Sequence, residues 1–87
     1  MNFENSIILI TGGTGSFGNA FLKYILSSKD FNKVKEIRIL SRDECKQDAM
    51  RLNLNNEKVK FYIADIRDKS SLYRPFHNVD YIFHAAA

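Results

Sequence analysis

The residue types best suited to binding chemistry gather in a glycine-rich segment, residues 11–18, with the sequence TGGTGSFG. Its glycines at 12, 15 and 18 have a spacing close to that of dinucleotide-binding turns. Gly12 permits a tight turn, Gly15 lets the backbone approach a pyrophosphate, and Gly18 lets the next helix pack closely on a sheet. No Gly-Lys-Ser/Thr follows, so the segment is not a P-loop. The spacing predicts a turn that binds the phosphates of a dinucleotide.

The surroundings of this turn strengthen that interpretation. A strand-like apolar run precedes it and a helical pattern follows, so a phosphate would meet a helix N-terminus with free N–H groups and a partial positive charge. Ser16 and Phe17 lie at that terminus and are expected to donate through their backbones, and Thr14 is expected to contact the same ligand. The alternative is a glycine-rich turn that binds nothing.

A second candidate region follows the next strand-like run. NAD-specific sites place an acidic residue there, about 20 positions beyond the glycines, to accept from the ribose 2′-hydroxyl. Here Arg42 takes that place, with Lys46 four residues later on the same face of an expected helix. Two cations there could hold a 2′-phosphate, which favours NADP, with NAD as the alternative. Asp43 could contact the ribose or favour the first helical turn, and Ser41 could contact the cofactor or only cap the helix.

Two further strand ends complete the predicted site. Asp65 and Ile66 follow the third apolar run, where a carboxylate and a backbone group can meet the adenine amino group. A simple turn carboxylate is the alternative for Asp65. The run Ala85, Ala86 and Ala87 follows the fourth, and its small side chains leave room for a flat ligand to lie against the backbone.

The elements that must position these residues follow from the hydrophobic pattern. We expect strands over residues 6–10, 36–40, 59–63 and 80–84. Helical segments separate them, which implies an α/β fold with a parallel sheet and helices on its faces. Right-handed crossovers favour the Rossmann-type doubly wound sheet, with strand order 3-2-1-4. Residues 1–87 are then one NAD(P)-binding domain.

The helix boundaries follow from capping patterns. Apolar residues recur at helical spacing after the glycine turn, at Phe17, Ala20, Phe21, Tyr24 and Ile25. The second helix is expected to begin with a capping box of Ser41 and Glu44 and to run to about residue 53. Asp68 is the expected N-cap of a short third helix, which Pro75 should end or kink.

Composition narrows the partners. The 87 residues carry a net charge of +3, but basic and acidic residues interleave, which argues against a nucleic-acid partner. No apolar run approaches the ~20 residues of a membrane span, and the N-terminus lacks the features of a signal peptide. The single cysteine, Cys45, can form no internal disulfide and suits a cytoplasmic setting. We assign no metal site, and we expect His84 to be a core histidine with a hydrogen-bond partner.

Together these motifs resemble the extended short-chain dehydrogenase/reductase group, and more narrowly the bacterial UDP-N-acetylglucosamine 4,6-dehydratases of capsule, O-antigen and flagellin-sugar synthesis. The narrower signal is the run SRDE followed by KQ at residues 41–47, together with the triple alanine. The resemblance implies bound NADP, a UDP-sugar held by a later domain, transient oxidation at C4 of the sugar, loss of water across C5–C6, and return of the hydride. Two departures from the family are Ala64, where glycine is usual, and Pro75.

Enzymes of this group use a Tyr-x-x-x-Lys pair for proton transfer, and none of the four tyrosines has a lysine four positions later. We therefore expect no catalytic residue and no activity in this chain alone, as the N-terminal part of a longer enzyme. The alternatives are a non-catalytic NAD(P)-binding module and a different sugar-nucleotide epimerase or reductase. The apolar run at residues 81–83 would lack an outer neighbour, so we also expect self-association through this edge.

Overall fold

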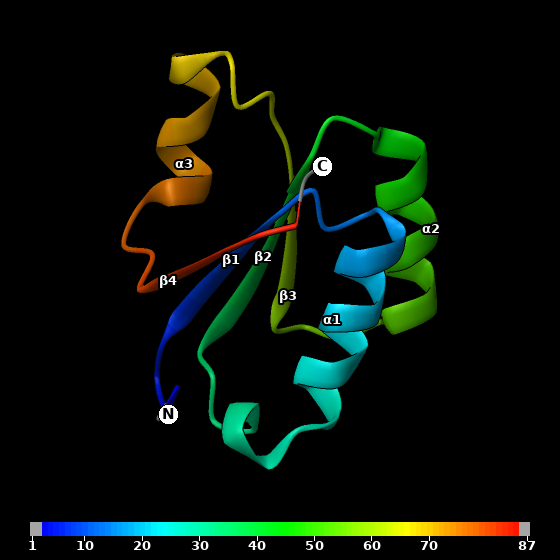
Figure 1. Cartoon of the computed structure of the whole chain (residues 1–87), viewed down its shortest axis with the longest axis vertical. Helices are drawn as coiled ribbons and strands as arrows, with labels where there is room; N and C mark the ends of the chain where they lie inside the picture. Colours follow the sequence, from blue (N-terminus) through cyan, green and yellow to red (C-terminus); the bar gives the residue numbers. More distant parts are fainter. Residues whose placement is uncertain (1–2, 86–87) are drawn as a thin grey trace.

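The computed structural model describes residues 3–85 and contains a four-stranded sheet (Figure 1). The strands are β1 (Ile7–Thr11), β2 (Glu36–Ser41), β3 (Val59–Ile63) and β4 (Tyr81–His84). They lie in the order β3-β2-β1-β4, and each neighbouring pair is parallel. The predicted α/β doubly wound sheet and its strand order are confirmed, and the predicted strand ends are right to within one residue.

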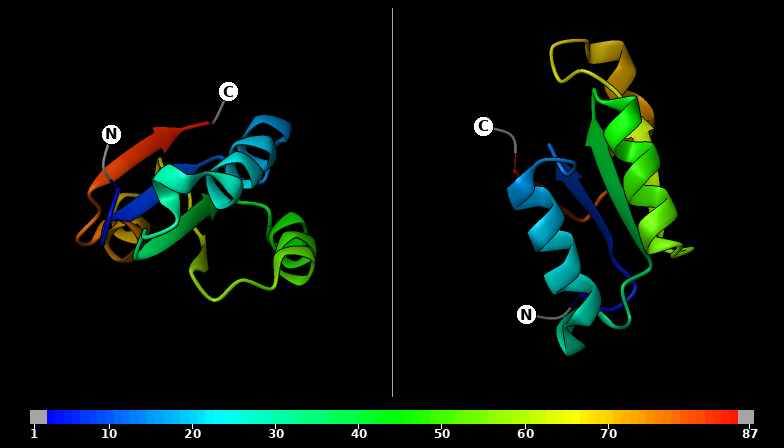
Figure 2. Two further views of the ribbon diagram at one scale, coloured as in Figure 1. Left: turned by 90° about the horizontal axis from the view of Figure 1, so that it is seen from below. Right: turned by 90° about the vertical axis from the view of Figure 1, so that its right-hand side faces the viewer.

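Helices cover both faces of the sheet (Figures 1 and 2). α1 (Ser16–Ser27) and α2 (Glu44–Leu54) lie on one face, and the 3-10 turn Lys29–Phe31 leads from α1 to β2. The 3-10 helix Lys69–Leu72 and α3 (Tyr73–Phe76) lie on the other face. This is the arrangement that right-handed crossovers produce, because the connection to β4 runs in the opposite direction across the sheet. No helix in the described part of the chain is long and apolar enough to cross a lipid bilayer.

The central strand β1 forms the middle of the core. Ile8, Leu9 and Ile10 have 0% exposed surface. Ile8 and Ile10 belong to the larger apolar cluster beneath α1 and α2. Leu9 points to the opposite face and forms a smaller cluster with Leu40 and Ala64, against the segment that contains α3. Burial on both faces explains why this strand is a continuous apolar run.

The buried face of α1 differs from the predicted stripe. Gly18, Leu22 and Ile25 are buried, whereas Phe17 is 67% and Tyr24 54% exposed. Both rows have helical spacing, but only the row that contains glycine lets the helix backbone come close to the turn before it. The stripe was therefore right for Ile25 and wrong for the two exposed aromatic residues.

The displaced side chains form an aromatic row on the surface of α1. Ring centroids are 6.0 Å apart between Phe17 and Phe21 and 6.5 Å apart between Phe21 and Tyr24. Phe21 is half-buried and reaches β4 through Phe83, at a centroid distance of 4.8 Å. Ala20 is exposed as well. These aromatic side chains therefore lie on the side of α1 that is next to β4, and not on the helix face that packs on the sheet.

The capping box predicted for α2 is wrong. The helix begins at Glu44, and the N-cap is Asp43, whose carboxylate accepts from the backbone N–H of Lys46 at 3.0 Å. Ser41 is the last residue of β2, and its carbonyl accepts from the backbone N–H of Ala64 at 3.0 Å. Pairing with the neighbouring strand therefore keeps Ser41 in the sheet and leaves capping to the residue two positions later.

The short third helix also differs from the prediction. Asp68 precedes the 3-10 helix as predicted, but its side chain caps no backbone N–H and instead accepts from the hydroxyl of Ser70 at 2.9 Å. Pro75 lies inside α3, which ends one residue later at Phe76. A proline is tolerated there because a first helical turn has no intrahelical acceptor for its N–H group.

A buried arginine on β2 holds the C-terminal end of α3. Nη1 of Arg38 donates to the backbone carbonyls of Arg74, Pro75 and His77 at 3.3, 3.0 and 2.6 Å. Its Nε donates to the Glu36 carboxylate, and the Arg38 side chain is only 10% exposed. Because α3 is a single turn, this side chain supplies much of what fixes it to the sheet.

Candidate functional site

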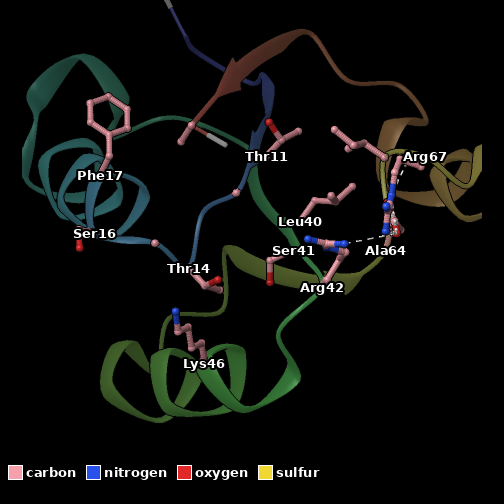
Figure 3. A pocket seen from close by; sticks show the side chains of 15 residues that line it. Thr11, Thr14, Ser16, Phe17, Leu40, Ser41, Arg42, Lys46, Ala64 and Arg67 are labelled. Carbon is pink, nitrogen blue, oxygen red and sulfur yellow. Dashed lines mark hydrogen bonds and ion pairs between the residues drawn. The ribbon is translucent and has the colours of Figure 1, made fainter. Parts of the chain in front are cut away.

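A cavity of about 720 Å³ opens at the carboxyl ends of the parallel strands (Figure 3). Segments that follow all four strands contribute to its lining: Thr11, Gly12, Thr14, Gly15, Ser16, Phe17, Leu40, Ser41, Arg42, Lys46, Ala64, Asp65, Ile66, Arg67 and Ala85. Ligands of doubly wound sheets bind at this edge. The volume lies within the range of about 300–1,000 Å³ that is usual for small-molecule sites.

The turn between β1 and α1 has the backbone geometry that its glycines predict. Gly12 has a φ of 69°, in the left-handed region that glycine adopts without strain. A Cβ atom on Gly18 would lie 2.5 Å from the Cα of Gly13, so this position needs glycine for the helix to reach the turn. The predicted role of Gly12 in a tight turn is confirmed. Gly18 was expected to let the helix pack on the sheet, and the close contact that it permits is instead with Gly13 in the turn itself.

Gly15 differs from the other two. It is the N-cap of α1, and its added Cβ would meet only the carbonyl oxygen of Gly12, at 3.7 Å. No contact with the described residues therefore requires glycine here, which fits a position kept clear for a ligand. The helix has no acidic residue in its first turn and no side-chain cap. Its first N–H groups have no intrahelical acceptors, and Ser16 and Phe17 at the start of the helix line the cavity.

The basic residues after β2 line the same cavity but approach it differently. Lys46, on α2, extends toward the glycine turn near Thr14, and Arg42 extends toward Arg67 (Figure 3). The predicted shared helix face is wrong, because α2 begins only at Glu44 and Arg42 precedes it. The loop nevertheless brings both cations to one cavity.

Asp65 lies between two arginines. Its carboxylate accepts from Arg67 at 2.8 to 3.2 Å, and Nη1 of Arg42 lies 3.7 Å away. The side-chain hydrogen bond from Arg67, helped by that residue's backbone N–H, holds the pKa of the Asp65 carboxyl well below its usual range. The same pairing raises the pKa of the Arg67 guanidinium. Asp65 is therefore ionised, and its carboxylate already accepts hydrogen bonds from Arg67.

The cavity gathers most of the predicted site residues. Those that line it are Gly12, Thr14, Gly15, Ser16, Phe17, Ser41, Arg42, Lys46, Asp65, Ile66 and Ala85. Gly18 packs behind the turn, and Asp43 is not among the lining residues because it caps α2. Ala86 and Ala87 lie outside the described residues.

Four lining residues are not among the predicted cofactor contacts, although Ala64 was noted as a departure from the family, and each is adjacent in sequence to a predicted contact. They are Thr11, Leu40, Ala64 and Arg67. Their shared signal is position, since they lie at or just beyond a strand's carboxyl end. His84 was expected in the core, but it is exposed on β4, and its Nδ1 lies 2.5 Å from the hydroxyl oxygen of Thr11.

The donor set of the cavity suits a phosphate-bearing ligand. Arg42 and Lys46 carry donors only, and the start of α1 adds backbone N–H groups. The two nearby carboxylates already accept hydrogen bonds within the protein, Asp43 at the helix cap and Asp65 from Arg67. The residues present therefore fit a dinucleotide whose anionic groups accept hydrogen bonds.

Comparison with known proteins agrees with this geometry. The UDP-glucose 4-epimerase of Rickettsia prowazekii is 58% identical over 85 residues, which are 98% of this chain and 25% of the relative. The enzyme of the same name from Rickettsia canadensis is 55% identical over the same shares. The chain thus spans about a quarter of the length of the curated relatives it matches.

Solved structures match the fold. Pen from Bacillus thuringiensis superposes with a TM-score of 0.86 at 33% identity, over 100% of this chain and 26% of that one. The NADPH-bound carbonyl reductase from chicken fatty liver has a TM-score of 0.75 at 14% identity, over 99% and 36% of the two chains, and shows likeness of fold alone. Residues 8–87 match the family described as polysaccharide biosynthesis protein. The chain therefore belongs to the polysaccharide biosynthesis protein family and has its Rossmann-type β-α-β sheet.

Proposed function

We propose that this chain is the NADP-binding, N-terminal part of a nucleotide-sugar enzyme that oxidises C4 of a UDP-hexose. The observation that carries the proposal is the cavity at the carboxyl edge of the sheet, where the glycine turn and two cations meet. The pyrophosphate would lie at the start of α1, against Gly15 and the N–H groups of Ser16 and Phe17. The cytoplasmic setting expected from the single cysteine belongs to the same proposal.

The choice of NADP over NAD rests on the end of β2. A ribose 2′-hydroxyl is best recognised by a carboxylate that accepts from it, and Asp43 already accepts at the helix cap. Arg42 and Lys46 instead match a 2′-phosphate, which only accepts. Arg42 would leave Asp65 to do so, at little cost, because their ion pair is long at 3.7 Å and the Arg42 side chain is 67% exposed.

The adenine would lie on the β3 side of the cavity, near Ile66 and the Asp65 carboxylate. Ala64 is 6% exposed at this strand end, and its methyl group narrows the approach compared with glycine. Ala85, which lines the cavity at the end of β4, would face the nicotinamide half of the cofactor. When bound, the cofactor supplies a hydride acceptor for C4 of the sugar, and the residues of this chain bind and orient it.

Oxidation at C4 of the sugar can lead either to dehydration or to epimerisation. The sequence motifs resemble UDP-N-acetylglucosamine 4,6-dehydratases, which lose water across C5–C6, whereas the curated relatives are called UDP-glucose 4-epimerases. We favour the dehydratase on the SRDE and KQ motifs at residues 41–47. Product analysis of a full-length enzyme that carries this segment separates them, because dehydration gives a 4-keto-6-deoxy sugar and epimerisation conserves the mass.

Binding is tested by calorimetric titration of the chain with NADP⁺ and NAD⁺. We expect NADP⁺ to bind more tightly, and Arg42→Ala to weaken it by about tenfold or more, the effect of losing a hydrogen bond to a charged group. Arg51→Ala is the matched control, since Arg51 is an exposed arginine that pairs with Asp48 outside this cavity. Equal affinities of the wild-type chain for the two nucleotides would contradict the proposal.

A further inference from the structure

A buried glutamine on α2 lies directly behind the candidate 2′-phosphate region. Gln47 is 1% exposed, and its side-chain nitrogen lies 2.8 Å from the carbonyl oxygen of Tyr62 and 2.9 Å from the hydroxyl oxygen of Ser41. A backbone carbonyl only accepts, so the atom facing Tyr62 must be the NH₂ nitrogen. This contact fixes which way the amide points.

The orientation of the amide determines what Ser41 can do. The NH₂ group has two hydrogens, one for Tyr62 and one for Ser41, so the Ser41 hydroxyl oxygen acts as an acceptor toward Gln47. Its own hydrogen remains, and residues 3–85 provide no acceptor for it. Ser41 is 8% exposed and lines the cavity beside Arg42 and Lys46. The cavity is therefore where that hydrogen can find an acceptor.

The other half of the glutamine amide gives independent support. Oε1 of Gln47 is buried and has no hydrogen-bond partner among the described residues. Leaving such a group unpaired costs about 1–3 kcal/mol, a cost that an apolar side chain on this buried helix face would avoid. A glutamine here is therefore poorly explained by packing and well explained by the two bonds its nitrogen donates.

We propose that Gln47 is a positioning residue that sets the preference for a 2′-phosphate by holding the Ser41 hydroxyl as a donor. A serine that is not fixed can donate or accept and so serves a ribose hydroxyl and a phosphate alike. Fixed as a donor, Ser41 joins Arg42 and Lys46 in a set that favours an oxygen that only accepts. This inference rests on the proposed NADP-binding function.

The test compares the ratio of NADP⁺ to NAD⁺ affinity in wild type, Ser41→Ala, Gln47→Met and the double variant. We expect each single variant to lower the ratio by about tenfold to a hundredfold, as for one lost hydrogen bond to a charged group, with NAD⁺ affinity nearly unchanged. Because Gln47 acts through Ser41, the second substitution should lower the ratio no further in the double variant. Met50→Leu, on the buried face of the same helix, is the control and should leave the ratio as in wild type.

The possible outcomes distinguish a failure of the Gln47 inference from a failure of the proposed NADP-binding function. A ratio unchanged in Ser41→Ala, which removes only a hydroxyl and should fold, overturns the inference even if Gln47→Met does not fold. Additive losses in the double variant overturn it too, because they would mean that Gln47 acts independently of Ser41. If the wild-type chain shows no preference, or Arg42→Ala leaves the preference intact, the proposed function fails and this inference with it. If Arg42→Ala lowers the ratio and the Ser41 and Gln47 variants do not, only the inference fails.

Discussion

The arginine that joins β2 to α3 offers the sharpest test of the fold. Arg38→Met keeps an unbranched apolar stem but removes the guanidinium and its donors, so three backbone carbonyls lose a charged partner. One Nη1 nitrogen has only two hydrogens, so we count two full bonds at about 1.5–3 kcal/mol each. The Glu36 carboxylate also loses its partner, but it is 23% exposed and partly solvated. We therefore expect a loss of about 3–5 kcal/mol, as for other broken buried charge pairs.

That loss is large for a domain of this size. At about 0.05–0.15 kcal/mol per residue, the stability of an 87-residue chain is roughly 4–13 kcal/mol. A loss of 3 kcal/mol corresponds to a fall of about 12–24 °C in the melting temperature. Calorimetry measures the fall, and amide hydrogen exchange should show the residues of α3 opening first. Arg38→Lys, which keeps the charge without the planar guanidinium, should have a melting temperature between those of the wild type and Arg38→Met.

The control is Arg51→Met. Arg51 forms an exposed ion pair with Asp48, so we expect a change of less than about 1 kcal/mol. If Arg38→Met melted within about 2 °C of the Arg51 control, the buried hydrogen bonds would contribute little, and the account of how α3 is held would be wrong.

Three further predictions concern the turn, the ion pair and the sheet edge. Gly18→Ala should prevent folding, since its Cβ would meet backbone at 2.5 Å, whereas Gly15→Ala should fold and lose nucleotide affinity. Circular dichroism measures whether each variant folds, and titration measures its affinity for the nucleotide. A folded Gly18→Ala would refute the packing argument. The pKa of Asp65 is lowered, so its pairing with Arg67 should persist at neutral pH and be lost only below the ordinary value of 3.8; an NMR titration with an ordinary midpoint would disprove this. Ile82 is 52% exposed on the edge strand and should promote self-association of the chain, which Ile82→Lys should reduce. Sedimentation at several concentrations measures this, and a wild-type chain that stays monomeric at all of them would contradict the prediction.

The fold was predictable because its signals are local. Four apolar runs and the helical patterns between them are enough to order a parallel sheet, once crossover handedness is assumed. The boundary at Ser41 was not predictable from capping rules, since pairing with Ala64 extends β2 through that residue. The face of α1 was ambiguous for a similar reason: two apolar rows compete, and contact with the turn at Gly13 selects the one containing Gly18.

The candidate site divides in the same way. Its glycines and cations were found because their residue types and spacing are tied to a known chemistry. The roles of Arg67 and Gln47 were not predicted, because they depend on contacts that spacing does not reveal. Arg67 reaches back to Asp65 across a turn, and the Gln47 amide meets Tyr62 from a different element. Side chains that act on other side chains leave little trace in a single sequence.

The cavity is lined by segments from the ends of all four strands, and this has a thermodynamic consequence. A ligand that touches them together acts as a reversible cross-link that the unfolded chain cannot form. At a concentration 100 times its dissociation constant, such a ligand adds about 2.7 kcal/mol to the free energy of unfolding. That is close to the loss expected for Arg38→Met. If the proposed function holds, the resistance of the chain to heat and to proteolysis will follow the supply of its cofactor.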